Sequence, residues 1–310
     1  MIVIEALFAL TWNLLYGVAG LAAFGHAAFF AIGAYFVGVL LKLAPGVPFL
    51  LLLAGAGLVG ALAAWLVGAV AIRRTTGIAL AILTMALGEI LRSVAGYTEV
   101  LGKDDGLVAI PRPSIGGISL GSGTAYYLFL CVVCTLLACA LWWFTCSQYG
   151  RMLRSIRQDP VRAEFMGIKV QRCRVLAFVV SGALATLAGG LMAPLTQIVT
   201  PEIGNIMHST QPMLNSLLGG VGSFWGPAVG ALIFGFLSYG TRTLVGISEI
   251  VSGGILLLIV LAAPSGLLGT VDKMLRSQRK KAPEARPVAS AEPAARAPLA
   301  GAAASIKGAP

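Results

Sequence analysis

The chain has 310 residues, of which 58% are hydrophobic and only 11% are charged. Soluble domains carry about a quarter charged residues, so this composition excludes an ordinary water-soluble globule and favours a protein whose solvent is the lipid bilayer. The formal net charge of +10 gathers in a few segments that we expect on one membrane face, where anionic lipid attracts it. It therefore does not indicate nucleic-acid binding.

Apolar segments long enough to cross a bilayer, which takes about 20 mostly apolar residues, recur along most of the chain. In order they cover residues 2–20, 24–41, 48–72, 75–97, 125–147, 173–195, a weaker glycine-rich piece near 205–221, 226–245 and 248–264. The sequence therefore predicts an all-α polytopic membrane protein with about eight or nine transmembrane helices, some of them short or broken.

A change in composition near residue 270 divides the chain into two predicted parts. Residues 1–270 form the transmembrane domain, which a polar loop at residues 148–172 interrupts. Residues 271–310 begin with a Lys/Arg cluster and continue as an Ala/Pro-rich run. Such a run cannot bury enough apolar surface to offset its chain entropy, so we predict a disordered basic tail.

Lys and Arg residues predict the orientation, because the cytoplasmic loops of membrane proteins are enriched in them. Residues 148–174 carry seven Lys and Arg against two acidic residues, whereas the 196–212 loop has Glu202 and no Lys or Arg. We expect the 148–172 loop and the tail in the cytoplasm, so an even number of crossings separates them, and 205–221 counts as one short crossing. The same parity puts the N-terminus outside, an arrangement that a further preceding helix would explain.

Several strings typical of enzymes are present without their structural context. GAGLVG at 55–60 matches a dinucleotide-binding fingerprint but lies within an apolar helix. GISLG at 117–121 matches a nucleophile elbow but lies in a polar loop without a paired His and Asp. The chain has no GxxxxGK[ST] loop and no HExxH, and its mid-helix CxxC has no second ligand pair. We predict no catalytic site, no metal and no cofactor in this chain.

Polar side chains inside the apolar segments are candidates for a translocation path or gate, because such residues are costly in a membrane. His26 begins an apolar helix and fits either a gating role or that of a hydrogen-bonded packing histidine. Glu89 and Arg92 share one helix face at i,i+3 spacing, which favours a structural ion pair over a pair of substrate ligands.

Glycines near residue 226 are further candidates for the path. Gly222, Gly226 and Gly230 lie four residues apart, and Pro227 starts or breaks a helix there. Small residues at this spacing pack helices closely, and interrupted helices line transport pathways, although close packing alone explains most of the pattern.

The stretch QYGRMLRSIRQDPVRAEFMGI, residues 148–168, predicts two short helices outside the membrane. One cationic face is predicted from residues that recur every three positions: Arg151, Arg154 and Arg157. Asp159 and Pro160 are an N-cap and the proline favoured at the first helical position, and Gly167 is placed to end the second helix. An amphipathic loop resting on lipid explains the charges, but this order of signals predicts a compact helical knob.

The same stretch, continued as GRMLRSIRQDPVRAEFMGIKVQRCRVLAFVVSGALATLAGGLMAP, resembles the coupling loop and following helix of ABC-importer permeases for branched-chain amino acids. More particularly, it resembles the M-type subunit of the leucine/isoleucine/valine system. Further blocks agree in order and spacing over roughly residues 8–269: LTWNLLYGVAGLAAFGHAAFFAIGAY, TTGIALAILTMALGEILR, GKDDGL, LGGVGSFWGPAVGA and APSGLLG.

The resemblance implies a non-enzymatic transport subunit in a bacterial inner membrane. It implies two cytoplasmic ATPase subunits that use ATP, a homologous sister permease, and a periplasmic solute-binding protein that delivers substrate at the 98–124 and 196–212 loops. Residues 150–168 would be the coupling helix in an ATPase groove. The ATPase-coupling residues so implied are Gly150, Arg151, Arg154, Arg157, Asp159, Ala163, Glu164, Gly167 and Ile168.

Within that helix, Ala163 and Gly167 occupy the alanine and glycine slots of the permease EAA…G signature that the resemblance implies. The chain departs from the family at Val161-Arg162, where an acidic or small residue is usual, and at Pro160, where a Glu is common. These departures concern the detailed ATPase contacts and leave the coupling role itself as the expectation.

Other functions remain open from the sequence. The expected substrates are branched-chain amino acids, and the alternatives are urea, short amides or other amino acids. A stand-alone secondary transporter or channel would need an ion site of membrane carboxylates, for which Glu89 is the candidate. A lipid-modifying enzyme would need clustered His, Asp and Glu near one interface, which the sequence lacks.

Overall fold

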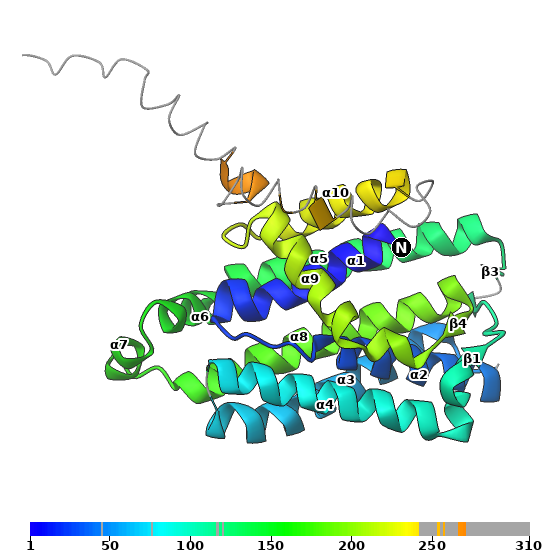
Figure 1. Cartoon of the computed structure of the whole chain (residues 1–310), viewed down its shortest axis with the longest axis horizontal. Coiled ribbons are helices and arrows are strands. Elements are labelled where there is room, and N and C mark those ends of the chain that lie inside the picture. Colours follow the sequence, from blue (N-terminus) through cyan, green and yellow to red (C-terminus); the bar gives the residue numbers. More distant parts are fainter. Residues whose placement is uncertain are drawn as a thin grey trace, which may run out of the picture. The chain divides into compact units, whose positions relative to one another are not determined.

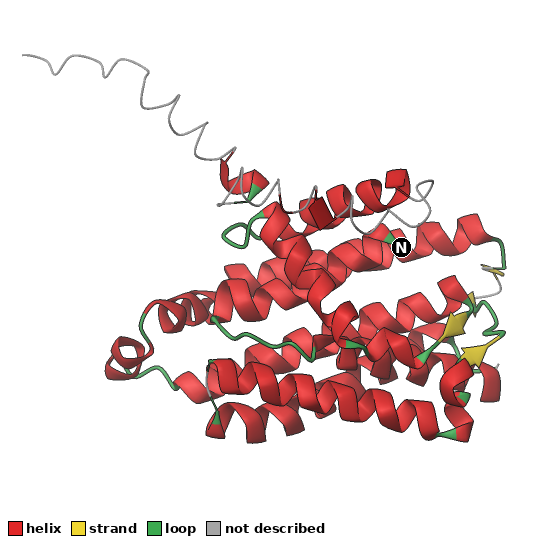
Figure 2. Cartoon of the chain, viewed as in Figure 1, coloured by secondary structure: helices red, strands yellow, loops and turns green. Residues whose placement is uncertain are grey.

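The computed structural model describes residues 1–44, 46–75, 77–115, 118–119, 121–241, 253–254, 257 and 266–270. They all fall within one compact unit, Met1–Asp272. The described residues form a bundle of helices with short strands at one end (Figures 1 and 2). The predicted tail, residues 271–310, and most of the predicted segment 248–264 lie outside them.

Among the described residues, six helices are long and apolar enough to cross a membrane. They are Ile2–Ala19, which joins α1 (Ile2–Asn13) to the π-helix η1 (Leu14–Ala19), then α2 (His26–Leu43), α3 (Phe49–Arg74), α4 (Ile78–Tyr97), α5 (Gly123–Cys146) and α8 (Val170–Thr196). The shorter α9 (Ile206–Gly219) and α10 (Gly226–Thr241) lie where the crossings 205–221 and 226–245 were predicted. The prediction of an all-α polytopic membrane protein is confirmed.

Helix α8 is the centre of the bundle, where it packs along α2 and α3. The backbones of α2 and α8 touch at two glycines, because a Cβ on Gly33 would collide with the carbonyl of Thr186 and a Cβ on Gly189 with that of Phe30. Small residues allow such close approach, which maximises van der Waals contact between helices that have no water to exclude.

The start of α2 lies deep in the bundle because the chain doubles back after η1. Gly20 adopts a left-handed φ of 70°, and residues 21–25 then return alongside α1. The Trp12 indole donates to the Ala23 carbonyl at 3.0 Å, and the Phe24 amide donates to Thr84 Oγ1 at 3.2 Å. Non-helical backbone at membrane depth requires such internal partners. The predicted segments 2–20 and 24–41 leave a gap here, but the sequence had not predicted that the gap folds back inside the bundle.

The two ends of the bundle carry different structures (Figure 1). One end bears the helices α6 (Gln148–Gln158) and α7 (Pro160–Phe165). The other bears η2 (Glu99–Leu101), η3 (Lys103–Asp105), β1 (Leu107–Val108), β2 (Ser114–Ile115), β3 (Ile118–Ser119), β4 (Ile198–Val199) and η4 (Pro201–Gly204). Strand β1 pairs with β4 in antiparallel register, Leu107 opposite Val199, so the two polar loops at 98–122 and 197–205 form one cap.

Candidate functional site

The α6–α7 knob, residues 148–168, has the local structure that its sequence predicts. The Asp159 carboxylate accepts from the amides of Val161 and Arg162 at 3.0 and 3.1 Å, and Pro160 is the first residue of α7. At the other end Gly167 has a φ of 82°. Its amide donates to Glu164 at 2.9 Å. These bonds satisfy helix-end groups that would otherwise need water.

A small apolar core of its own holds the knob in shape. Ile156 from α6, Ala163 from α7 and Val170 from α8 are buried together, with the partly buried Ile168 against them. The Ile168 amide donates to the Ala163 carbonyl at 3.1 Å, which brings the turn back over α7. Ala163 is fully buried, so a larger or charged side chain there would displace this core.

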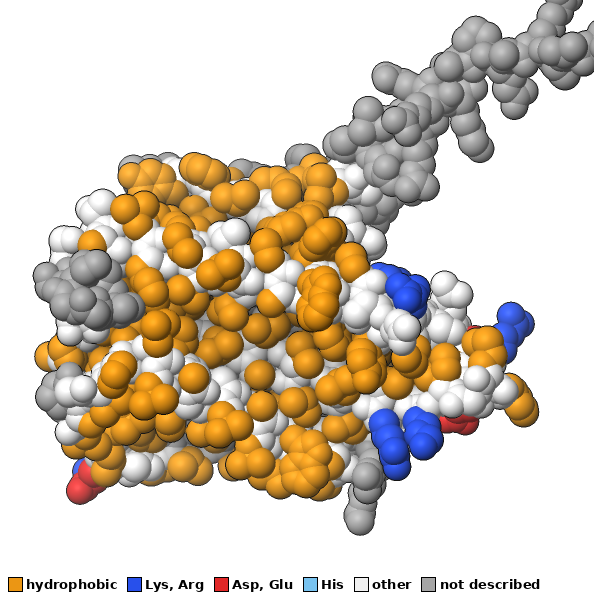
Figure 3. All heavy atoms as spheres, turned by 180° about the vertical axis from the view of Figure 1, so that it is seen from behind, with side chains coloured by type: hydrophobic (Ala, Val, Ile, Leu, Met, Phe, Trp, Pro, Cys, Tyr) orange, Lys and Arg blue, Asp and Glu red, His pale blue; other side chains and the backbone are white. Residues whose placement is uncertain are grey.

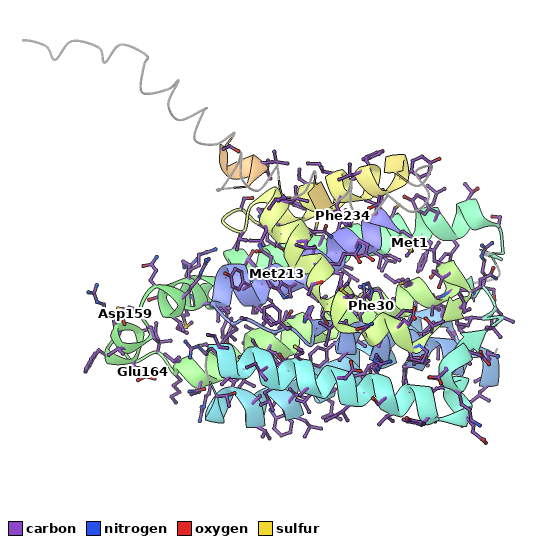
Figure 4. The ribbon with its side chains drawn as sticks, viewed as in Figure 1. Met1, Phe30, Asp159, Glu164, Met213 and Phe234 are labelled. Atoms are coloured by element: carbon purple, nitrogen blue, oxygen red, sulfur yellow. The ribbon has the colours of Figure 1, made fainter. Side chains whose placement is uncertain are left out.

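The tip of the knob is unusually apolar for a surface outside the bundle. Phe165 is 88% exposed, Met166 66% and Val161 59%. Asp159 and Glu164 lie at the same tip, beyond the ends of the long helices (Figure 4). Exposed apolar clusters rimmed by charge mark protein-interaction surfaces. The sequence had predicted no contact role for Phe165 and Met166. The signal that could have predicted one is the position of two large apolar residues next to the glycine that ends α7.

All three arginines of the predicted cationic face of α6 are exposed, and two of them also bond to backbone carbonyls. Arg151 and Arg154 are exposed, and the Arg151 guanidinium donates to the Cys146 carbonyl at 3.2 Å. The Arg157 guanidinium instead donates to the carbonyl of Gly17 in η1. Arg157 is also exposed and lines one cavity with Arg154, so it belongs to the cationic face and in addition links the knob to the first membrane helix.

Gly150 connects the knob to α5. It is buried, and a Cβ there would collide with the carbonyl of Thr145. The chain can therefore enter α6 directly from α5 only with glycine at this position. Together with Arg157, this contact joins the knob firmly to two membrane helices.

His26 lies in the core of the bundle, fully buried against helices α1 and α8. Its Nε2 is 3.0 Å from Thr11 Oγ1, and its ring stacks on Phe8 with centroids 5.3 Å apart. The Ser181 hydroxyl donates to the Thr11 carbonyl at 2.6 Å. This placement fits the packing interpretation, and a gating role for His26 stays a prediction.

The second histidine, His208 on α9, packs against the other side of the same aromatic cluster. Its ring lies 5.6 Å from Phe8 and 5.1 Å from Phe30, which Figure 4 labels in the middle of the bundle. The sequence separates the two histidines by more than half the chain, so their common packing against Phe8 could come only from the tertiary structure.

Glu89 and Arg92 form the predicted ion pair, with Arg92 Nε donating to Glu89 Oε1 at 2.7 Å. Both side chains are more than a third exposed, and Asp104 and Glu202 act electrostatically on Arg92 from the capping loops. The pair therefore belongs to the capped end of α4. A role in the translocation path stays a prediction.

Helix α10 begins at Gly226, where the predicted crossing 226–245 begins, so the glycine stripe does not continue through Gly222 as one helix. Gly222 lies in the preceding turn, and Pro227 is the second residue of the helix. A Cβ on Gly230 would collide with the carbonyl of Asn215, and one on Gly219 with that of Gly226. Gly226 and Gly230 thus pack α10 tightly against α9, as the close-packing interpretation expected.

The outer surface separates apolar flanks from charged ends. Hydrophobic side chains cover most of the flank seen from behind, and Lys and Arg gather at the end that carries α6 and α7 (Figure 3). In the membrane-length windows of α3, α4 and α5 only 28% of the residues are buried inside the molecule. Among the described residues, no group of three or more His, Cys, Asp or Glu could hold a metal ion.

Comparison with known proteins identifies the family. The family model described as the permease component of branched-chain amino acid transport systems matches residues 1–263. No solved structure matches the chain.

Three relatives illustrate the match, all described as high-affinity branched-chain amino acid transport system permease proteins. LivM of Salmonella typhimurium is 30% identical over 86% of this chain and 68% of its own length. LivM of Escherichia coli is 30% identical over 83% of this chain and 65% of its own length, so the chain spans about two thirds of the LivM proteins. LivH of Salmonella typhimurium is 28% identical over 85% of this chain and 91% of its own length. The chain belongs to the family of permease components of branched-chain amino acid transport systems.

Proposed function

We propose that the chain is a membrane-spanning permease subunit of an ATP-driven importer for branched-chain amino acids. The family match and the names of the LivM and LivH relatives support this substrate class. Similarity to both LivM and LivH supports assembly with a homologous sister permease. The permease itself is not an enzyme, and we assign ATP hydrolysis to two partner ATPases in the cytoplasm.

Charge at the two ends supports an orientation with the α6–α7 knob in the cytoplasm and the strand cap outside a bacterial inner membrane. The knob and its flanks carry seven Lys and Arg against two acids. The described loops of the opposite cap carry two basic residues, Lys103 and Arg112, against four acids, Glu99, Asp104, Asp105 and Glu202, and Lys42 lies in the last turn of α2 beside them.

The position of Gly266 supports an even number of membrane crossings between the knob and the tail. Gly266 lies against Gly219 and Gly220, at the loop between α9 and α10. That loop reaches the knob's end of the bundle, because Val221 lies against Gly17, whose carbonyl binds Arg157. The described residue Gly266 therefore lies at the same end as the knob, which supports a cytoplasmic tail.

The coupling mechanism follows from the contacts of the knob. Its exposed apolar tip, Val161, Phe165 and Met166, is the part that a partner ATPase can reach. Movement of the tip would pass to α5 through the close contact at Gly150 and to η1 through the Arg157 guanidinium. Alternating access then requires the membrane helices to reorient around a path while ATP drives the cycle.

The opposite cap is suited to receive substrate from a solute-binding protein. It is built from both polar loops, which β1 and β4 join, and Lys42 adds a bond to the Val108 carbonyl at 3.0 Å. A joined cap moves as a unit, so docking of a partner on one loop would reach the helices of both. The role of these loops as the delivery surface rests on the proposed function.

The observation that carries the coupling role is the knob itself, capped at both ends, with a rigid core and an exposed apolar tip in a chain of this family. The test is reconstitution with the sister permease, the ATPases and the binding protein in proteoliposomes. We expect ATP-dependent uptake of leucine, isoleucine and valine in preference to urea, acetamide and other amino acids. Uptake without ATP, or preference for urea, would refute the proposal.

A further inference from the structure

A cavity of about 560 Å³ lies beside α1, α9 and α10, close to one residue of α5. Its wall includes Glu5 of α1, Gln211 and Asn215 of α9, Phe234 of α10 and Tyr127 of α5. Met1 and Phe234, both in the wall, lie near each other on the upper flank in Figure 4. The volume falls within the range of about 300–1,000 Å³ that is usual for small-molecule sites.

Three polar atoms at this cavity have no hydrogen-bond partner among the described residues. They are Oε2 of Glu5 and both Oδ1 and Nδ2 of Asn215, all of them buried. Asn215 is 1% exposed, so water outside the protein does not reach its amide. Buried polar groups in proteins are nearly always paired, and polar groups within a membrane are a functional-site signal.

The arrangement of the polar groups follows from the helices. Gln211 and Asn215 are four residues apart on α9 and therefore share one face. Gln211 Oε1 lies 3.4 Å from His208 Nδ1, which orients the Gln211 amide. Gly230 lets α10 approach α9 at the backbone of Asn215, and this contact fixes the asparagine against the cavity.

The rest of the wall is apolar and includes Ile2, Phe234 and Phe236 beside the Tyr127 ring. A ligand that complements the cavity must offer a cation for Glu5, both an acceptor and a donor for the Asn215 amide, and an aliphatic body for the wall. A bare cation leaves the apolar wall unfilled, and a fatty acid offers Glu5 no cation.

We propose that this cavity binds one aliphatic α-amino acid inside the membrane during transport. The ammonium group lies at the Glu5 carboxylate. The carboxylate accepts from the Asn215 amide, with Gln211 beside it, and the aliphatic side chain lies against Phe234 and Ile2. The inference rests on the proposed function and adds to it a binding site within this subunit.

The test uses the reconstituted transporter and measures ATP-dependent uptake of labelled leucine as a function of leucine concentration. Glu5→Gln and Asn215→Leu each remove a charged or polar contact, and we expect each to raise the KM for leucine by about tenfold or more. Thr135→Val is the control, because Thr135 is an exposed residue of α5 outside the cavity, and we expect no change.

Phe234→Ala provides a readout that misfolding cannot imitate. Enlarging the apolar wall should shift uptake from leucine toward phenylalanine while the assembled complex keeps its amount in the membrane. If the wild-type complex takes up leucine, but Glu5→Gln keeps its KM and Phe234→Ala keeps its preference, the cavity is not the site and the proposed function stands. If the wild-type complex takes up no aliphatic amino acid, both are refuted.

Discussion

Replacing Gly167 tests whether the shape of the knob transmits the work of the ATPases. Gly167 has a φ of 82°, in the left-handed region, and its amide donates to the Glu164 carbonyl at 2.9 Å. No atom lies within 4 Å of a Cβ built there, so a substitution acts through the backbone alone. The turn also positions Ile168 to bond with Ala163 and close the small core of the knob.

The structure sets the size of the effect. Alanine in the left-handed region costs about 1–2 kcal/mol, which lowers the population of the native turn by a factor of about 5 to 30. Proline fixes φ near −65°, about 150° from the observed angle, and removes the amide that bonds Glu164. The bond adds about 0.5–1.5 kcal/mol, and the native turn cannot form around a proline at all.

The assay is ATP hydrolysis by the reconstituted complex, with and without leucine-loaded binding protein. We expect partial loss of stimulation for Gly167→Ala and complete loss for Gly167→Pro, with both variants inserted in the membrane at normal levels. Gly46→Ala is the matched control, because its Cβ also meets nothing within 4 Å and its φ is not positive. Its effect should stay within about 0.5 kcal/mol. Normal stimulation in Gly167→Pro would refute the coupling role.

Three further predictions concern other contacts. Ala163→Asp puts an unpaired carboxylate into the core of the knob at a cost of about 3–5 kcal/mol, and should abolish stimulated ATP hydrolysis without loss of membrane insertion. Glu89→Gln should lower the thermal stability in detergent more than the double replacement of Glu89 and Arg92 does, although the exposure of the pair keeps the difference small; a less stable double variant would contradict the ion-pair interpretation. Arg157→Met should reduce the leucine taken up per ATP hydrolysed, because α6 loses its bond to Gly17. Arg157→Lys keeps one donor and should restore part of this uptake. Equal uptake per ATP in the two variants would exclude this link.

Local signals determined the parts of this protein whose structure depends on neighbouring residues. Runs of apolar residues long enough for a bilayer predicted the helices, because membrane backbone must satisfy its own hydrogen bonds. Asp159, Pro160 and Gly167 predicted the start and end of α7, because capping and positive φ are local properties. The i,i+3 spacing predicted the Glu89–Arg92 pair, because residues three apart lie on one face of a helix.

Contacts between distant segments were beyond such local signals. The path of the chain before α2 depends on partners from other helices, such as Thr84, which accepts from the Phe24 amide. No residue near Phe24 in the sequence predicts that partner. The glycine spacing and Pro227 predicted close packing and a helix start near residue 226, but only the structure shows that α10 packs on α9 at Asn215 and Gly219.

The sequence by itself determined that this protein lies in a lipid bilayer, where most of its helices run and what shape the knob has, because composition and spacing along one chain are sufficient for these. Only the tertiary structure decided that Arg157 points to η1, that two polar loops join as one cap, and that Glu5 and Asn215 line the same cavity. Nothing in the sequence links Glu5 to Asn215, because Glu5 is the one acidic residue of α1 and Asn215 is one of several polar residues of α9, more than 200 positions away. Their meaning arises when packing of α1, α9 and α10 places both beside one space and leaves their polar atoms without partners among the described residues.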